Sequence, residues 1–298
     1  MSFPLSIIPQ EKFSEHPFLS RLLELHDIPK QLYIAGNLPE VTIDEYGRAT
    51  PRILSVIGSR KNTNYGRNSV EKLISTLAGE QVIILSGLAY GTDSIAHSNA
   101  LKNNLVTIAI PGSGLDSKVI YPKAHLNLAE EIINKGGALI SELDPNTPAA
   151  QWTFPARNRI VAALSDAVLI IEASDKSGAL ITARQALELG RDIGAVPGEI
   201  FSPTSVGTNM LIRDGAYMIA NGDDLYALLH ISKKENKEIT RNYTKEEQTI
   251  MDILTEPIEK DLLLIKCNLS PQQFMMTLSS LEMKGVVEEI FGEVRRIG

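Results

Sequence analysis

The chain has 298 residues, and its 43% hydrophobic content is that of an ordered globular protein rather than a disordered one. The single cysteine, Cys267, excludes an intrachain disulfide and a cysteine-cluster zinc site, and the five histidines show no metal-ligand spacing. The net charge of −7 gives no general attraction to nucleic acid or to anionic membranes, and no segment reaches ~18 consecutive apolar residues. We therefore expect a cytoplasmic protein with no membrane association, in which any nucleic-acid contact is local.

Short apolar runs alternate with helix-sized amphipathic segments from about residue 53 to residue 220. Six runs are predicted to be strands: 53–57, 82–85, 106–110, 138–141, 167–171 and 193–196. Several of them are apolar on both faces, as parallel strands covered by helices on each side must be. The pattern predicts an α/β fold with a doubly wound parallel sheet. In such a sheet, ligands bind beyond the carboxyl ends of the strands, where the strand order reverses.

Glycine-containing turns follow most of these strands. The turns are Gly58-Ser59-Arg60, Ser86-Gly87-Leu88-Ala89-Tyr90-Gly91, Pro111-Gly112-Ser113-Gly114, Ser177-Gly178 and Pro197-Gly198. Glycine lets backbone amides approach an anion closely, and a helix amino end stabilises negative charge. Each turn alone is more often just a tight turn, and the chain has neither a dinucleotide fingerprint nor a Gly-Lys-Ser/Thr phosphate loop. Only the set as a whole predicts anion binding.

Two stretches without acidic residues carry the candidate cations. Residues 46–70 contain five basic residues and no acid, and no acid lies between Asp144 and Asp166. Arg60 follows the first glycine turn, where a guanidinium can contact phosphate with two N–H groups. Arg157 and Arg159 are two positions apart, which on a helix separates them by about 200°. We therefore expect only one of them to face a ligand.

Two aromatic residues, Trp152 and Phe154, precede these arginines. They are either base-stacking platforms or core anchors of the helix, and the sequence leaves both open.

Asp93 and His97 lie four positions apart, and so on one face of the expected helix. An acid beside a histidine suits acid–base catalysis, but no serine or cysteine nucleophile motif accompanies them. We favour a structural hydrogen-bonded pair, and we expect no catalytic residue, no metal and no cofactor: the chain is predicted not to be an enzyme.

The C-terminal part has the pattern of a second domain. A charged linker is predicted over 231–243. A helix with a capping box at Thr244, a helix starting at Ser270 and a hairpin around Phe291-Gly292 then predict a winged helix over 244–298. Residues 244–298 carry six basic and ten acidic residues, and the expected recognition helix has one cation, Lys284. This charge favours protein contact or packing over DNA binding.

Taken in order, these blocks resemble the DprA (Smf) family of DNA-processing proteins, from about residue 17 to residue 229. The blocks are Gly58-Ser59-Arg60, Ser86 to Asp93 with His97, Gly114-Leu115-Asp116 with Tyr121-Pro122, Ile140-Ser141-Glu142, Phe154 to Ile160, Ser177 to Ala183, and Pro197-Gly198 with Gly207-Thr208-Asn209 and Gly215-Ala216. The resemblance implies an extended Rossmann-like fold with a C-terminal winged-helix domain. It also implies a homodimer that binds single-stranded DNA without cutting it and loads the RecA recombinase during natural transformation.

The resemblance assigns a set of DNA-binding residues. They are Gly58, Ser59, Arg60, Lys61, Gly87, Gly91, Gly112, Ser113, Gly114, Phe154, Arg157, Asn158, Arg159, Ser177 and Gly178. One departure puts a phosphate contact in doubt, since Gln151 stands where some members have a basic residue. The expected domains are 1–50, an extension packed on the sheet domain, then 51–230, the linker 231–243, and 244–298. Residues 205–229 are a candidate for the dimer surface.

An alternative function on the same fold is a nucleotide-processing enzyme of the phosphoribohydrolase kind. Such enzymes use a Pro-Gly-Gly-x-Gly-Thr-x-x-Glu loop, and the nearest match, Pro197-Gly198-Glu199, lacks the second glycine and the later threonine and glutamate. A purely structural adaptor is a third possibility.

Overall fold

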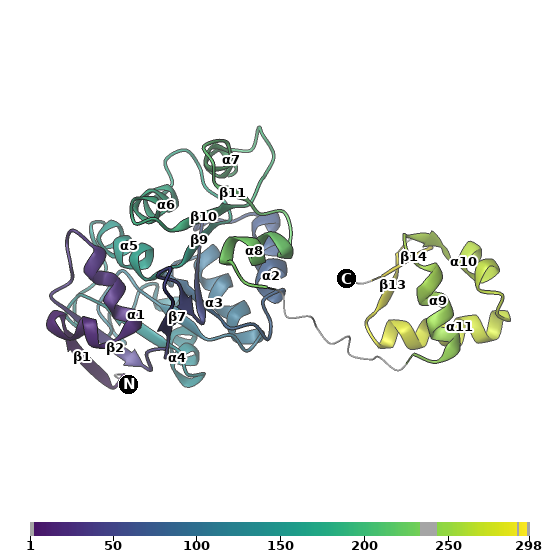
Figure 1. Cartoon of the computed structure of the whole chain (residues 1–298), viewed down its shortest axis with the longest axis horizontal. Helices are drawn as coiled ribbons and strands as arrows, with labels where there is room; N and C mark the ends of the chain where they lie inside the picture. Colours follow the sequence, from purple (N-terminus) through teal and green to yellow (C-terminus); the bar gives the residue numbers. More distant parts are fainter. Residues whose placement is uncertain (1–2, 233–242, 291, 297–298) are drawn as a thin grey trace. The chain divides into compact units, whose positions relative to one another are not determined.

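The computed structural model describes residues 3–232, 243–290 and 292–296. The chain divides into two compact units, Met1–Lys234 and Glu235–Gly298, which are treated separately below (Figure 1). Most of the expected linker, residues 233–242, lies outside the described residues. Among the helices of the described part, none is long and apolar enough to cross a membrane.

The large unit is built on one extended sheet. Within the described residues, this sheet has nine strands in the order β1-β2-β8-β7-β6-β5-β9-β10-β11. The strands are β1 (Leu5–Pro9), β2 (Gln31–Gly36), β5 (Arg52–Ile57), β6 (Val82–Ser86), β7 (Thr107–Ala109), β8 (Ala138–Ser141), β9 (Ala167–Ile170), β10 (Asp192–Ala195) and β11 (Tyr217–Met218). All six predicted strands are present, with bounds that differ from the prediction by no more than one residue.

Seven neighbouring strands of the sheet, β8-β7-β6-β5-β9-β10-β11, are parallel. Their order runs outward from β5 in both directions. On one side follow β6, β7 and β8, and on the other β9, β10 and β11. The order therefore reverses between β5 and β9, and the predicted doubly wound, Rossmann-like sheet is confirmed.

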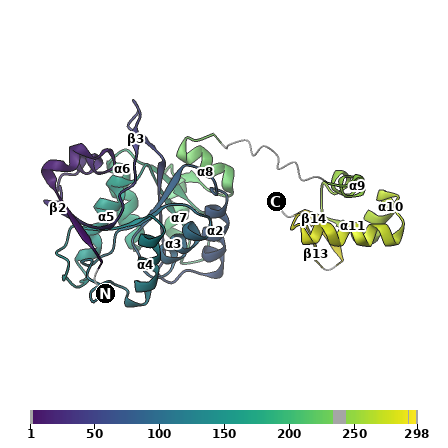
Figure 2. The same cartoon turned by 90° about the horizontal axis from the view of Figure 1, so that it is seen from below.

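Helices cover both faces of this sheet (Figures 1 and 2). One face packs against α1 (Pro17–Ser20), α5 (Thr153–Leu164), α6 (Gly178–Glu188) and α7 (Val206–Arg213). The other face packs against α2 (Asn64–Ser75), α3 (Thr92–Lys102), α4 (Leu126–Asn134) and α8 (Gly222–Leu229). Strand β5 shows the cause, since Ile53 and Ile57 belong to the first core and Leu54 and Val56 to the second.

The first fifty residues extend the sheet at one edge. Strands β1 and β2 pair antiparallel with each other, and β2 pairs antiparallel with β8. The short helices η1 (Gln10–Glu15), α1 and η2 (Arg21–Glu24) bury Phe13, Phe18 and Leu22 in the core beside α5. A small hairpin, β3 (Thr42–Ile43) with β4 (Ala49–Thr50), precedes β5.

The small unit contains α9 (Lys245–Ile253), β12 (Ile258–Glu259), α10 (Lys260–Cys267), α11 (Pro271–Met283), β13 (Val287–Ile290) and β14 (Glu293–Arg296). Its strands form an antiparallel sheet in the order β12-β14-β13, and capping boxes at Thr244 and Ser270 begin α9 and α11. The sequence did not predict α10, whose run of leucines and isoleucine lacks a clear polar face. The order of elements fits the expected winged helix.

Candidate nucleic-acid interface

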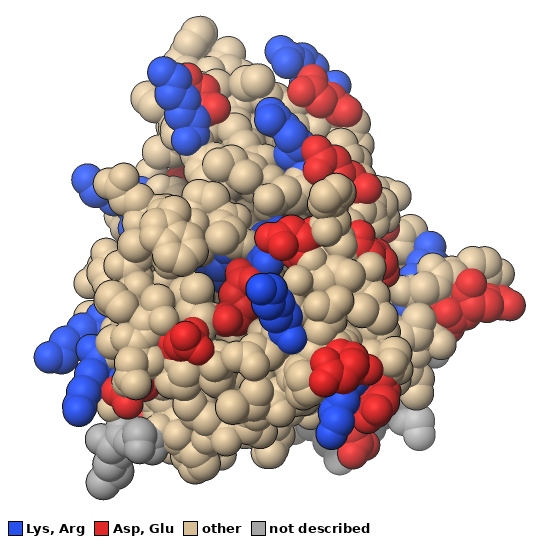
Figure 3. All heavy atoms as spheres, turned by 90° about the vertical axis from the view of Figure 1, so that its left-hand side faces the viewer, with Lys and Arg blue, Asp and Glu red and all other residues tan. Residues whose placement is uncertain are grey.

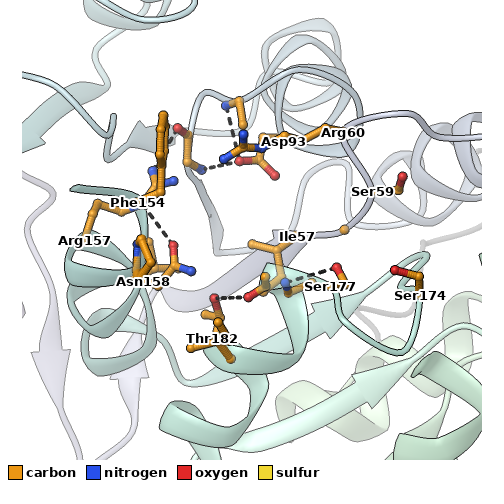
Figure 4. Close-up of a pocket in the computed structure, with 18 of the residues that line it drawn as sticks. Ile57, Ser59, Arg60, Asp93, Phe154, Arg157, Asn158, Ser174, Ser177 and Thr182 are labelled. Carbon is orange, nitrogen blue, oxygen red and sulfur yellow. Dashed lines mark hydrogen bonds between the residues drawn. The ribbon is translucent and has the colours of Figure 1, made fainter. Parts of the chain in front are cut away.

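A cavity of about 460 Å³ lies at the carboxyl ends of β5 and β6 and at the turn between β9 and α6. We call it the switch-point cavity, because the strand order reverses here. Its lining includes Ile57, Gly58, Ser59, Arg60, Gly87, Ala89, Asp93, Gln151, Phe154, Arg157, Asn158, Ser174, Ser177, Gly178, Ile181, Thr182 and Thr204. Figure 4 shows residues of α5 on one side of this space and Ser59, Ser174 and Ser177 on the other. Nine of the fifteen residues expected from the sequence line this cavity.

Two contacts hold the turn after β5: the close approach of Gly91 and hydrogen bonds to the buried carboxylate of Glu172. Gly91 has φ +77°, and a Cβ there would lie 2.3 Å from the carbonyl oxygen of Ser59. Glu172 is buried and accepts hydrogen bonds from Thr63 N at 2.9 Å and Thr63 Oγ1 at 2.6 Å. Both contacts fix the course of the turn that presents Arg60. The neighbouring Lys61 is exposed and does not line the cavity.

Arg60 is exposed, and its guanidinium carbon lies 4.6 Å from the centre of the Phe154 ring. The ring of Phe154 in turn covers Gly112, where a Cβ would lie 2.5 Å from a ring carbon. Cation–π contact therefore places an accessible guanidinium over an aromatic ring at the rim of the cavity. The sequence did not predict this contact between a turn and a helix that are far apart in the chain.

Arg157 is buried at the base of the same cavity. Its Nη1 donates a hydrogen bond to the carbonyl oxygen of Gly87 at 2.8 Å, and its Nε donates to Asn158 Oδ1 at 3.2 Å. Burial lowers the pKa of Arg157 to about 10; the carboxylate of Asp93 opposes this shift, and Arg60 adds to it. Arg157 therefore stays charged at neutral pH, and its contacts hold the turn after β6 in place.

Asp93 and His97 are both structural, but they do not bond to each other as the sequence suggested. Asp93 accepts hydrogen bonds from the amides of Gly87 and Ala89, at 3.1 and 3.3 Å, and burial raises its pKa. His97 is fully buried, and its Nδ1 lies 2.7 Å from Thr107 Oγ1. The expected pair is therefore wrong in its partners, because each side chain braces a different strand end.

Arg159 points away from the cavity. Its two Nη atoms each lie 2.7 Å from an oxygen of Glu142, and Nη2 lies 3.5 Å from Asp27. Of the two arginines in this helix, Arg157 faces the cavity and Arg159 is ion-paired.

The third glycine turn does not open into the cavity either. Gly112 lies beneath Phe154, Ser113 is fully buried, and Gly114 packs against the backbone of Asp144 and Pro145. The carbonyl oxygen of Gly112 accepts a hydrogen bond from Thr153 Oγ1 at 2.6 Å. This turn therefore supports the start of α5.

The start of α6 forms the remaining wall. The Ser177 hydroxyl accepts a hydrogen bond from Ala179 N at 3.2 Å and caps the helix. Gly178 is exposed, and a Cβ there would meet no atom within 4 Å. An anion at this wall would meet the positive end of the helix dipole and a backbone with free space above it.

Charge is mixed on one face of the molecule. Figure 3 shows the face that carries β1 and α1, where Lys and Arg side chains alternate with Asp and Glu and are separated by uncharged surface. On this face, the described residues form no continuous basic track. The charges on this face therefore add no one-sided attraction for an anion.

Several residues of the site were not predicted. Glu172 was detectable, because it is the acid that directly follows the apolar run 167–171. Thr182, Ser174 and Thr204 carry no sequence signal of their own, since small polar residues occur throughout the chain. Trp152, the other candidate aromatic, is 62% exposed but does not line the cavity.

Comparison with known proteins gives consistent results. The sequence model of the family described as DNA recombination-mediator protein A matches residues 10–230. Protein Smf of Escherichia coli is 40% identical over 205 residues, which are 69% of this chain and 52% of that protein. DNA processing protein DprA of Streptococcus pneumoniae is 42% identical over 206 residues, which are 69% of each chain. The chain thus spans about half the length of the first relative and about two thirds of the second.

Two solved structures are similar over the same region. The X-ray structure of DprA from S. pneumoniae has a TM-score of 0.62 and 37% identity, covering 76% of this chain and 74% of that one. The structure of DprA from Helicobacter pylori, which describes that protein's unique single-stranded DNA binding mode, has a TM-score of 0.62 and 32% identity. It covers 76% of this chain and 96% of that one.

Proposed function

The chain belongs to the DNA recombination-mediator protein A family, and on that premise we propose that it binds single-stranded DNA at the switch-point cavity. The observation that carries this proposal is the pairing of Arg60 with Phe154 at the cavity rim. An exposed guanidinium provides a phosphate contact, and an aromatic ring provides a surface for a base. Duplex DNA hides its base faces, so this combination favours a single strand.

Each part of the cavity has a role in this proposal. Arg60, the turn at Gly58 and Ser59, and the start of α6 at Gly178 contact phosphates. A base stacks with Phe154 when the exposed Arg60 side chain turns from the ring toward a phosphate. Arg157 positions the turn at Gly87 rather than reaching far into the ligand, because its guanidinium is already bonded to that turn. Backbone amides and a few arginines recognise phosphate and not base identity, so binding is nearly independent of sequence.

The family suggests partners for the chain. We propose that it acts in the cytoplasm as a homodimer that loads the RecA recombinase onto single-stranded DNA during natural transformation. The family's description as a recombination mediator supports the RecA step. Exposed apolar side chains at Met210, Tyr217 and Met218, inside the candidate region 205–229, support the dimer.

The small unit has a different proposed role. We propose that it is a winged-helix domain that contacts protein rather than DNA. Its net charge supports this, and so does Lys284, whose Nζ lies 2.7 Å from both oxygens of Glu247. That lysine is therefore ion-paired within the small unit.

The experiment is a fluorescence anisotropy titration of the full chain with a labelled oligothymidine and with a duplex of the same length, at several salt concentrations. We expect preference for the single strand and a shallow salt dependence, because each neutralised phosphate adds only about 0.7 to the log–log slope. Equal affinity for both DNAs would contradict the proposal. Absence of binding would favour the nucleotide-processing alternative, which predicts release of free base from a panel of nucleotides.

A further inference from the structure

A second cavity lies at the amino ends of strands β5, β9 and β10, opposite the strand ends that line the switch-point cavity. It measures about 320 Å³, and we call it the N-edge cavity. It is lined by Arg21, Tyr46, Gly47, Arg48, Arg52, Asp166, Gly190, Arg191, Asp192, Leu228, Leu229 and His230. Strand β5 reaches both cavities, with Arg52 at this end and Ile57 at the other, about 17 Å away by strand geometry. The two cavities are therefore separate sites on one rigid element.

Four arginines converge on the N-edge cavity from four different segments. Arg21 comes from η2, Arg48 from the small hairpin, Arg52 from β5, and Arg191 from the turn before β10. Arg21 and Arg52 are only 4% and 9% exposed, so these charges are largely removed from water. Buried guanidinium groups at this density require acceptors or counterions.

The described residues supply some of these acceptors. Arg21 donates to the carbonyl oxygens of Leu164 and Ser165, at 3.2 and 2.7 Å, and its Nη2 lies 3.1 Å from Asp166. Asp166 is shared, because the amides of Ala49 and Ile53 also donate to it. The carboxylate that faces Arg21 is therefore already heavily used.

The other carboxylates compensate only partly. Asp192 lies 2.9 Å from His230 Nε2, so it serves that imidazole. Glu24 lies 2.6 Å from Arg191, and Asp44 lies 4.0 Å from Arg52, but the side chains of both acids are more than one third exposed. Solvent weakens such surface pairs. Of the residues that line the cavity itself, four are arginines and two are carboxylates.

Donors also remain unused. The Nε atoms of Arg21 and Arg191 are buried and have no hydrogen-bond partner among the described residues. The pKa of Arg21 is lowered by burial; Asp166 opposes the shift, and the charge of Arg191 adds to it. An anion in the cavity would reduce this repulsion between the two arginines.

We propose that the N-edge cavity is a second anion site that binds a phosphate group, carried either by a DNA backbone or by a small phosphate compound. Arg48, Arg52 and Arg191 contact it, since the planar fork of arginine matches the oxygens of phosphate. Arg48 is the arginine of this set that lies on the small hairpin. It is half-buried, with its guanidinium carbon 5.7 Å from the centre of the exposed Tyr46 ring.

The test measures binding of inorganic phosphate to the full chain by isothermal titration calorimetry at constant ionic strength. The variants are Arg48→Ala, Arg48→Glu and Arg60→Ala, with Arg184→Ala as the control, because Arg184 is exposed and lines neither cavity. We expect Arg48→Ala to weaken phosphate binding about tenfold or more and Arg48→Glu to abolish it, as lost charge-assisted hydrogen bonds do. Arg184→Ala should bind as the unaltered chain does. Arg60→Ala alters the switch-point cavity, and it should keep the phosphate binding that Arg48→Ala removes.

Two outcomes would overturn the proposal. The first is that the unaltered chain does not bind phosphate. The second is that phosphate binding is lost in Arg60→Ala and kept in Arg48→Ala. The affinities of Arg48→Ala for a short and a long oligothymidine identify the source of the phosphate. If the site binds a DNA backbone, the variant should bind the long oligothymidine more weakly and the short one unchanged. If the site binds a small phosphate compound, the affinity for both oligothymidines should be unchanged. Phosphate binding that depends on Arg48 would stand even if the chain bound no DNA, so this test is separate from that of the proposed function.

Discussion

Gly87 is the residue on which the geometry of the switch-point cavity depends most directly. A Cβ at this position would lie 2.5 Å from both Nη atoms of Arg157 and 2.6 Å from Asp93 Oδ2. The buried arginine and the buried carboxylate therefore meet in the space that a side chain would occupy. Gly178, on the opposite wall, has open space at the same position.

This contrast gives a matched pair of variants. Gly87→Ala should lower the free energy of unfolding by about 1–3 kcal/mol, because two packed polar groups must move, and should weaken binding of single-stranded DNA. Gly178→Ala should change stability by no more than about 1 kcal/mol. If a phosphate approaches that backbone, it should still weaken DNA binding. Urea unfolding and anisotropy measure the two effects, and unchanged DNA affinity in Gly178→Ala would remove α6 from the interface.

The sequence predicted the glycine turns but could not rank the cations beside them. Helical spacing shows that Arg157 and Arg159 point in different directions, but not which one faces the ligand. That choice is made by Glu142, which binds Arg159, and by the turn at Gly87, which binds Arg157. Both partners are remote in sequence, and their positions depend on the folded sheet.

His97 should make stability depend on pH. Burial, with smaller contributions from the charges of His125 and Arg157, lowers its pKa from 6.5 to about 3. The unfolded chain therefore binds a proton at this residue below about pH 6.5, and the folded chain does not until about pH 3. Stability from this residue is complete above about pH 6.5 and is lost as the pH falls.

We expect a loss of about 2 kcal/mol from this residue between about pH 7 and about pH 5, measured by urea unfolding. His97→Gln should reduce the pH dependence by that amount, whatever its effect on stability at neutral pH. His26→Gln serves as the control, since His26 is exposed. An unchanged pH dependence in His97→Gln would show that the imidazole is not held neutral by burial.

At the scale of single elements, the buried parallel strands were the most predictable part of the fold. Their apolar runs are continuous, because both faces are covered by helices. Strand β1 was missed because most of its side chains are exposed. Strand β2 has a buried apolar run over 32–35, but it lies outside the alternating region 53–220 from which strands were predicted. Helix α10 was missed because its apolar residues lie on several sides, with Leu262 and Ile265 exposed and Leu263 buried.

Helix α11 bears on the proposed protein-contact role of the small unit. Lys284 follows its last turn and is bonded to Glu247, whose side chain is 3% exposed. Lys284→Met should therefore destabilise the small unit by about 1–3 kcal/mol, because a buried carboxylate loses its cation. Binding of single-stranded DNA by the full chain should be unchanged. A marked loss of DNA affinity without a loss of stability would contradict the protein-contact role.

At the scale of the whole molecule, the proposed dimer requires an interface, and the last strand of the large sheet offers an exposed surface for it. Strand β11 is the last strand of the large sheet, and its Tyr217 and Met218 are 43% and 54% exposed. An unpaired strand edge with apolar side chains is a natural site for association.

Met218→Lys should weaken dimerisation about tenfold or more, since a buried methionine contributes about 1.5–3 kcal/mol. Light scattering over a range of protein concentrations measures the effect. Met276→Lys is the matched control, because Met276 is 69% exposed on the small unit and lies outside residues 205–229. A monomeric unaltered chain would contradict the proposed dimer, and dissociation caused by the control alone would place the interface elsewhere.

The central claim is that Arg60 at the switch-point cavity contacts single-stranded DNA. The direct measurement compares oligothymidine affinity and its salt dependence for the unaltered chain, Arg60→Ala and Arg184→Ala. Both variants lose one exposed arginine, so their net charge is the same. We predict that Arg60→Ala binds about tenfold or more weakly, with a log–log salt slope smaller by about 0.7, and that Arg184→Ala matches the unaltered chain. A folded Arg60→Ala variant with unchanged affinity and slope would show that the strand binds elsewhere.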